Sequence, residues 1–171
     1  MRTVLVLGTL LACACGDGGA PTPPAGRLHA TVVRLEDDST RDTVTFEAEA
    51  TARRCAEGRG VLVDGVVGGN GVLLWLKPGD SALTGEYAYA GRGDTTTPRS
   101  AVATVRFTSS DLARGVLLDS GRLAVREGEG VLAATLRGSG PAIPGAVRVD
   151  VEADFDGVPG PRDTVPCVPE P

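Results

Sequence analysis

The sequence predicts an all-β protein: an antiparallel β-sandwich or small β-barrel of about ten short strands. From residue 28 onward, apolar and polar residues alternate with a period of two, so that each segment has a core side and a water side. Turn-forming stretches rich in glycine, asparagine and aspartate separate these segments. No stretch of about twelve residues holds the 3.6-residue period of a helix.

Three segments alternate most clearly, namely 43–53, 101–107 and 146–156. The other predicted strands, in chain order, are 28–35, 60–63, 72–77, 86–90, 116–118, 122–127 and 131–137. Turns are predicted at 37–38, 68–71, 78–80, 128–130 and 138–145. The parity of these strands predicts a core in which Val147, Val149, Val151 and Phe155 face Phe46, Trp75, Val105 and Phe107.

Length and charge limit the possible functions. A chain of 171 residues is long enough for one domain with a stable core. Its formal net charge is −5, and no run of lysine or arginine exceeds two residues. Nucleic acid is excluded as a partner, because phosphate binding needs a concentrated basic face.

The amino-terminal segment has the pattern of a secretory leader. Arg2 precedes an apolar run at 3–12, ten residues that are too few to span a bilayer, and the run leads into Cys13 and Cys15. A small residue followed by cysteine at this point resembles the lipobox of bacterial lipoproteins. In that family the cysteine thiol is acylated and becomes the new amino terminus, so the resemblance implies attachment to a membrane through a covalent lipid.

The sequence favours Cys15 as the lipidated residue and leaves Cys13 as the alternative. The chain then divides into a signal peptide at 1–14, a flexible Gly/Pro tether at 15–26 and a single β domain at 27–171. No aspartate stands directly after either cysteine, which by the same resemblance implies the outer membrane of a Gram-negative bacterium. From Trp75 onward the turn glycines at 119–121 and 138–140, and a last strand ending near Phe155, also resemble small β-rich envelope lipoproteins.

Two cysteines remain in the domain, Cys55 and Cys167. An exported protein folds in an oxidising compartment, where two cysteines in one domain are expected to pair. We therefore expect a disulfide that closes a loop of about 110 residues and holds the Pro-rich tail to the end of the strand at 43–53.

No residue pattern requires catalysis, and we expect no catalytic residue, cofactor or metal. His29 is the sole histidine, too few for a zinc site. The glycines at 65–71 have the wrong spacing for a dinucleotide loop and fit a hairpin. The tripeptide 92–94, Arg-Gly-Asp, matches an integrin-binding motif but arises easily by chance. A weak calcium candidate remains, consisting of Glu152, Asp154, Asp156 and Asp163, whose first three members also fit the polar side of a strand.

These observations predict a membrane-anchored envelope lipoprotein with a non-enzymatic binding or structural β domain. The alternative is a carrier whose β-barrel holds a small, lipid-like molecule in an apolar interior. The sequence leaves the identity of the protein or small-molecule partner open.

Overall fold

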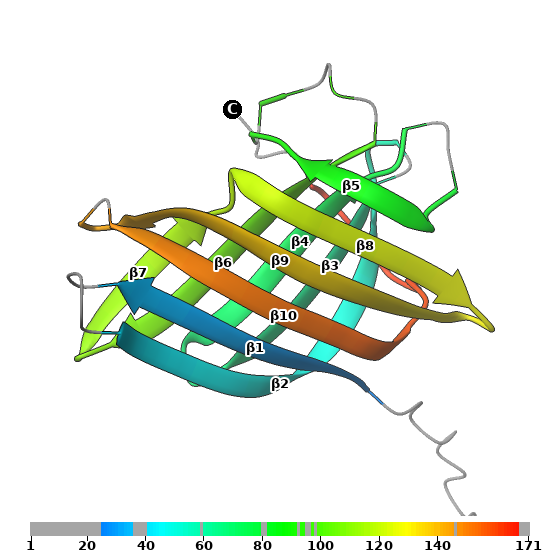
Figure 1. Ribbon diagram of the computed structural model, residues 1–171. Coiled ribbons are helices and arrows are strands. Elements are labelled where there is room, and N and C mark those ends of the chain that lie inside the picture. Colours follow the sequence, from blue (N-terminus) through cyan, green and yellow to red (C-terminus); the bar gives the residue numbers. More distant parts are fainter. Residues whose placement is uncertain are drawn as a thin grey trace, which may run out of the picture.

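The computed structural model describes residues 25–35, 41–58, 60–79, 82–91, 93–94, 97, 99–145 and 147–167, and none of these is helical. The predicted all-β fold is confirmed (Figure 1). Each of the ten predicted strands overlaps an observed one, and an eleventh short strand follows. The strands are β1 (Gly26–Leu35), β2 (Arg41–Cys55), β3 (Val61–Val67), β4 (Asn70–Lys77), β5 (Gly85–Tyr89), β6 (Ser100–Ser109), β7 (Leu112–Leu117), β8 (Ser120–Gly128), β9 (Val131–Ile143), β10 (Arg148–Pro159) and β11 (Thr164–Val165).

The strands pair in a closed, barrel-like ring. Their order is β1-β10-β9-β8-β5-β6-β4-β3-β2, and β2 pairs back with β1. Figure 1 shows β8, β9, β10 and β1 in front, crossing β7, β6, β4 and β3 behind them. Most pairings are antiparallel, as predicted, but β5 with β6 and β11 with β2 are short parallel pairings, so the sheet is mixed.

β7 and β8 act as one bent strand along the edge of β9. β9 pairs with β8 from Val131 to Ser139 and with β7 at Ala142 and Ile143. On the other side, β7 lies along β6, while β8 lies along β5. β5 therefore lies between β8 and β6 and pairs with both.

The turn between β3 and β4 shows how the sequence fixes a hairpin. Gly68 and Gly69 have φ angles of 54° and 85°, and they connect the paired residues Val67 and Asn70. A two-residue turn with both φ angles positive is the type I′ turn, which glycine adopts without strain. The glycine-rich segment 65–71 is thus a hairpin, as expected, and not a dinucleotide loop.

Inward-facing side chains fill the ring as a single hydrophobic cluster. Strands β1–β4, β6 and β8–β10 each contribute at least two buried residues, whereas β5 and β7 contribute one each, Tyr87 and Val116. In small barrels the interior is narrow enough for side chains to fill it in this way. Six of the predicted core residues are buried, and these are Phe46, Val105, Phe107, Val149, Val151 and Phe155. Their burial confirms the predicted parity of β2, β6 and β10.

Two predicted core residues behave differently. Trp75 was expected inside, but it lies half-buried on the outward side of β4, between the fully buried Leu74 and Leu76. The Lys77 ammonium sits 4.9 Å from the centre of the Trp75 ring. The prediction was wrong because the run 72–76 is apolar on both faces and shows no alternation. Val147 lies just before β10 begins and is only half-buried.

The turn predicted at 138–145 begins later than expected, because β9 continues to Ile143 and the turn residues are 144 and 145. Gly138 lies within the strand, where a Cβ atom would come 2.6 Å from the Ser120 carbonyl oxygen and 3.0 Å from the Tyr89 ring. The glycine therefore permits close packing rather than a change of direction. Similarly, β1 begins at Gly26, a residue assigned above to the tether.

The predicted disulfide is present between Cys55, at the end of β2, and Cys167. Their Cα atoms are 5.3 Å apart, within the range that a disulfide requires. The Arg54 amide donates to the Asp163 carbonyl at 2.8 Å, and the Ala56 amide donates to the Val165 carbonyl at 2.9 Å. The carboxy-terminal tail is thus held to β2 by backbone pairing as well as by the covalent bond.

The predicted leader and both candidate lipidation sites, Cys13 and Cys15, lie outside the described residues. Within the part of the chain that the structure describes, no helix has the length and hydropathy to cross a membrane.

Candidate functional site

His29 lies on the outward side of β1. Its Nδ1 atom is 3.3 Å from a carboxylate oxygen of Glu47 on β2, and both side chains are more than half exposed. Its neighbour on the other side is Asp154 of β10. A nucleophilic triad needs a hydroxyl or thiol on the imidazole. Among the described residues, the hydrogen-bond partner of the His29 ring is Glu47 instead.

The weak calcium candidate is spread out by the fold. Glu152, Asp154 and Asp156 alternate along β10 on its exposed side, so successive side chains are about 7 Å apart. Glu152 forms an ion pair of 2.6 Å with Arg137. Asp163 lies in the tail beside β2. Within the described ranges, no three acidic, histidine or cysteine side chains come close enough together to hold a metal ion.

The Asp94 carboxylate of the Arg-Gly-Asp tripeptide is engaged in its own loop. Its two oxygens accept hydrogen bonds from the Thr97 amide at 3.2 Å and the Thr97 hydroxyl at 2.5 Å. The Asp94 carbonyl accepts a further bond from Lys77 at 2.7 Å. Arg92 lies outside the described residues.

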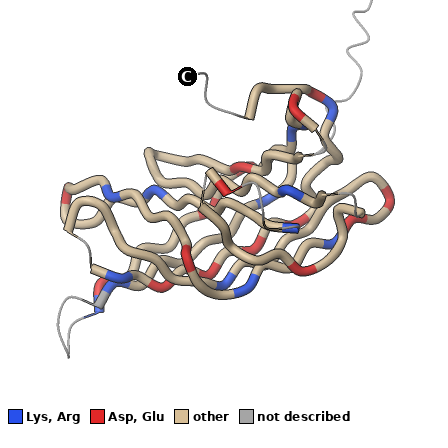
Figure 2. The backbone as a smooth tube through the Cα atoms, turned by 90° about the horizontal axis from the view of Figure 1, so that it is seen from above, with Lys and Arg blue, Asp and Glu red and all other residues tan. Residues whose placement is uncertain are grey.

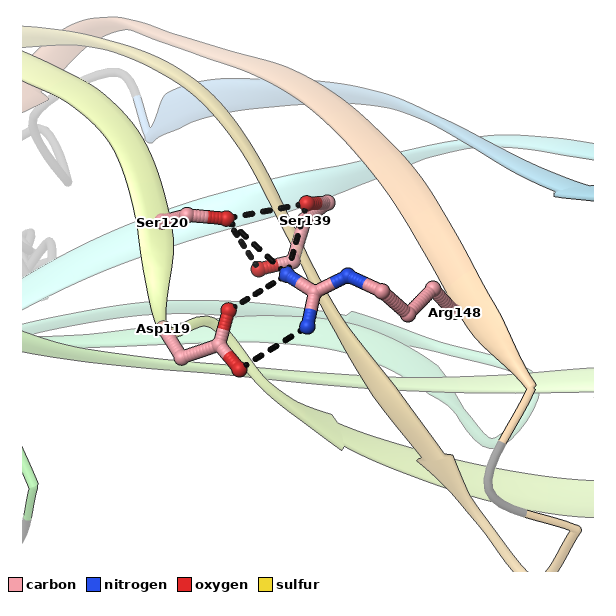
Figure 3. A network of polar contacts seen from close by, with 4 residues as sticks. All are labelled: Asp119, Ser120, Ser139 and Arg148. Atoms are coloured by element: carbon pink, nitrogen blue, oxygen red, sulfur yellow. Dashed lines mark hydrogen bonds and ion pairs between the residues drawn. The ribbon is translucent and has the colours of Figure 1, made fainter.

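A polar network links β8, β9 and β10 on the outside of the ring (Figure 3). Arg148 donates to both carboxylate oxygens of Asp119, at 2.6 and 3.1 Å. The same guanidinium contacts the hydroxyl groups of Ser120 and Ser139, each at 3.0 Å. Hydrogen bonding from Arg148 lowers the pKa of Asp119 below its ordinary value. The four side chains satisfy one another, which is typical of a cross-strand clamp rather than a vacant binding site.

A groove of about 620 Å³ lies on a different part of the outer surface, along β3, β4, β6 and β7. Cross-strand pairing aligns its outward residues in two rows. One row is Val66, Gly71, Arg106, Gly115 and Ile143, and the other is Asp64, Leu73, Thr104 and Leu117. The first row crosses five strands, which at the usual interstrand spacing is about 19 Å.

Two glycines flank Arg106 in the first row, but only one of them leaves a hollow. At Gly71 a Cβ atom would come 2.8 Å from the Gly65 carbonyl oxygen and 2.9 Å from the Val66 side chain, so that position is already packed. A Cβ atom at Gly115 would meet no other atom within 4 Å, so the space above it is open. Val66 and Ile143 stand at the ends of the row, 65% and 69% exposed, and form the walls. The groove is thus an apolar trough between two projecting aliphatic side chains.

The charge of the groove comes from arginine. Arg106 has no hydrogen-bond or ion-pair partner among the described residues. The Asp64 carboxylate, in contrast, accepts a 2.5 Å hydrogen bond from Arg53. Arg114 donates to the Pro144 carbonyl at 2.8 Å, at the turn that follows Ile143. A guanidinium without a partner among the described residues therefore lies in a mostly apolar groove of a protein whose net charge is −5.

Sequence reasoning did not identify this groove. Its residues come from five strands, and only the cross-strand register brings them into two rows. The available signals were weak: glycines inside strands at 71 and 115, and exposed aliphatic residues at 66 and 143.

Comparison with known proteins finds no match, whether to a family model, to a curated protein or to a solved structure. Function is therefore inferred from the residues of this chain and their chemistry.

Proposed function

We propose that this chain is a lipid-anchored bacterial envelope protein whose β domain binds a ligand in the outer groove and carries out no catalysis. The observation that carries the proposal is the apolar trough around the unpaired Arg106. Contiguous exposed apolar surface on a folded domain is typical of an interaction site, whereas scattered exposed aliphatic residues are not.

The lipid anchor is proposed from the leader and from the pair Cys13 and Cys15, with Cys15 favoured. A diacylglycerol on that cysteine would hold the domain at the membrane, and the Gly/Pro tether would separate the two. The outer membrane of a Gram-negative bacterium is the proposed location.

The ring of strands supports the alternative of a carrier with an internal pocket, but the side chains that fill the ring argue against it. Large inward side chains such as Phe107, Phe155 and Leu74 are at most 2% exposed. At one end the inward positions are polar, since Ser109 donates to Asp42, and Arg34 lies 3.9 Å from the same carboxylate. These features favour binding outside the ring over binding within it.

Metabolic labelling tests the anchor. We expect the wild-type protein to incorporate labelled palmitate and to sediment with membranes. Replacing Cys13 and Cys15 together with serine should abolish both properties, and the two single variants should identify the acylated thiol. An unlabelled wild-type protein and a double variant that remains on the membrane would contradict the anchor.

A dye whose fluorescence rises in apolar surroundings tests the groove. Gly115→Leu should fill the trough and remove dye binding. Gly128→Leu is the matched control, because Gly128 also lies in a strand with open space around it but is not among the residues that line the groove. Equal dye binding by both variants would show that the groove is not the site.

A further inference from the structure

We propose that the groove binds a free single-chain amphiphile with a carboxylate head group. The carboxylate pairs with Arg106, and the hydrocarbon chain lies from there over Gly115 toward Leu117 and Ile143. This inference rests on the proposed function of the groove and names its ligand class.

The head group follows from Arg106. A guanidinium presents two parallel N–H donors that match the two oxygens of a carboxylate. Asp64 does not supply that carboxylate, because Arg53 and Thr51 hold it at 2.5 and 3.1 Å. The neighbours of Arg106 in its cross-strand row are Gly71 and Gly115, neither of which has a side chain that could pair with the guanidinium. The positive charge of Arg106 is complementary to a negative head group.

The tail follows from the walls of the groove. Ile143 is mostly exposed, and burying it together with Leu117 under a hydrocarbon chain would remove apolar surface from water. Gly115 leaves a recess between Arg106 and Ile143, which suits one chain and not the flat surface of a bilayer.

A peptide is a poorer occupant, because the strands of the groove offer it no free edge. β4 pairs with both β3 and β6, and β6 pairs with both β4 and β7. β7 in turn pairs with β9. A peptide laid across them would leave its amide groups without partners, which is costly in an apolar groove, whereas a hydrocarbon chain has no such groups.

Calorimetric titration tests the ligand class. The protein is the full chain with Cys13→Ser and Cys15→Ser, which needs no detergent, and the probes are decanoate, dodecanoate and tetradecanoate below their micelle concentrations. We expect binding of one molecule per chain, with affinity rising about two- to fourfold for each added methylene. Dodecyltrimethylammonium, with the same chain length and the opposite charge, should bind at least tenfold more weakly.

Arg106→Gln should weaken dodecanoate binding about tenfold or more. Arg126→Gln is the matched control, since Arg126 is exposed on β8 and lies outside the groove; it should leave dodecanoate binding unchanged. Equal affinity for the anionic and cationic amphiphiles, or no effect of Arg106→Gln, would overturn the ligand class. Binding to phosphatidylglycerol vesicles but not to monomeric dodecanoate would overturn it in favour of a membrane surface.

The dye experiment separates the two proposals. If Gly115→Leu abolishes dye binding while dodecanoate fails to displace the dye from the parent protein, the groove stands as a site and the carboxylate amphiphile is wrong. If the dye never depends on Gly115, both are wrong.

Discussion

Two parts of the outer surface are built from the same kind of strand but treat their charges differently. On β8, β9 and β10, Arg148 is bound by Asp119 and two serines, and Arg137 by Glu152. On β4, β6 and β7, the central charge, Arg106, has no partner among the described residues, and its neighbours are glycines. Figure 2 shows basic and acidic residues interspersed over the molecule, so neither part belongs to a large region of one sign.

The glycines within the strands of these two parts differ in what surrounds them. On the polar part, a Cβ atom at Gly138 would come 2.6 Å from a backbone oxygen, so the glycine is required for close packing. The Tyr89 ring lies against it, and burial raises the pKa of that tyrosine. In the groove, the same residue type at 115 faces open space. A glycine inside a strand therefore indicates either a close approach, as at Gly138 and also at Gly71 in the groove, or a hollow, as at Gly115.

The largest effect is expected in the interior that both surfaces share. Phe155→Ala should lower the free energy of unfolding by about 3–5 kcal/mol, because it leaves a cavity in a close-packed core. Asp154→Ala, on the outward side of the same strand, should cost less than about 1 kcal/mol. Chemical denaturation measures both. The reverse order would mean that the inward and outward sides of β10 are exchanged.

The disulfide is expected to have the next largest effect, and to spare the groove. Replacing Cys55 and Cys167 with serine should cost about 2–5 kcal/mol, because the unfolded chain loses a long-range constraint. Dye binding by the folded fraction should not change. In the wild-type protein, both thiols should resist alkylation in denaturant until reductant is added, and rapid alkylation without reductant would disprove the bond.

A pair of alanine substitutions tests the contrast between the glycines. Gly138→Ala should cost about 1–3 kcal/mol, since the methyl group collides with backbone. Gly115→Ala should be neutral or should stabilise the protein by up to about 1 kcal/mol, because the unfolded chain loses freedom and nothing is displaced. Thermal unfolding compares the two variants. Equal losses at both positions would contradict the open space assigned to the groove.

The smallest effect is expected for the exposed clamp. The lowered pKa of Asp119 means that its contribution to stability is present above the ordinary carboxyl value and is lost as pH falls through the folded value, below about pH 4. Asp119→Asn should therefore lower the melting temperature slightly at pH 7, and this difference should shrink as pH falls below about 4. A difference that does not change with pH would mean that the carboxylate charge is not responsible.

The strands were predictable because alternation is local. In 43–53 and 146–156, a few neighbouring residues are enough to show which side of the strand is apolar. That side is the buried one in β2 and β10. Trp75 was not predictable, because its segment is apolar on both sides. The strand through Gly138 was not predictable either, since the reason for the glycine is the Ser120 backbone and a tyrosine far away in the chain.

The groove could not be predicted, because its residues are far apart in the sequence. Gly71, Arg106 and Gly115 come from three strands, and only the register of the pairings places them side by side. Nothing within any one strand marks Arg106 as unpaired, because its potential partners depend on the neighbouring strands. The disulfide was predictable, in contrast, because two of the four cysteines lie at the predicted leader and the other two are left in the domain.

Backbone amide chemical shifts of the full-length double serine variant, titrated with dodecanoate, test the groove most directly. We expect the largest changes at Arg106, Gly115, Leu117 and Ile143, with little change at Ser139 and Arg148 on the polar part. Changes concentrated instead at inward residues such as Leu136 and Val151 would place the ligand inside the ring and contradict binding in the outer groove.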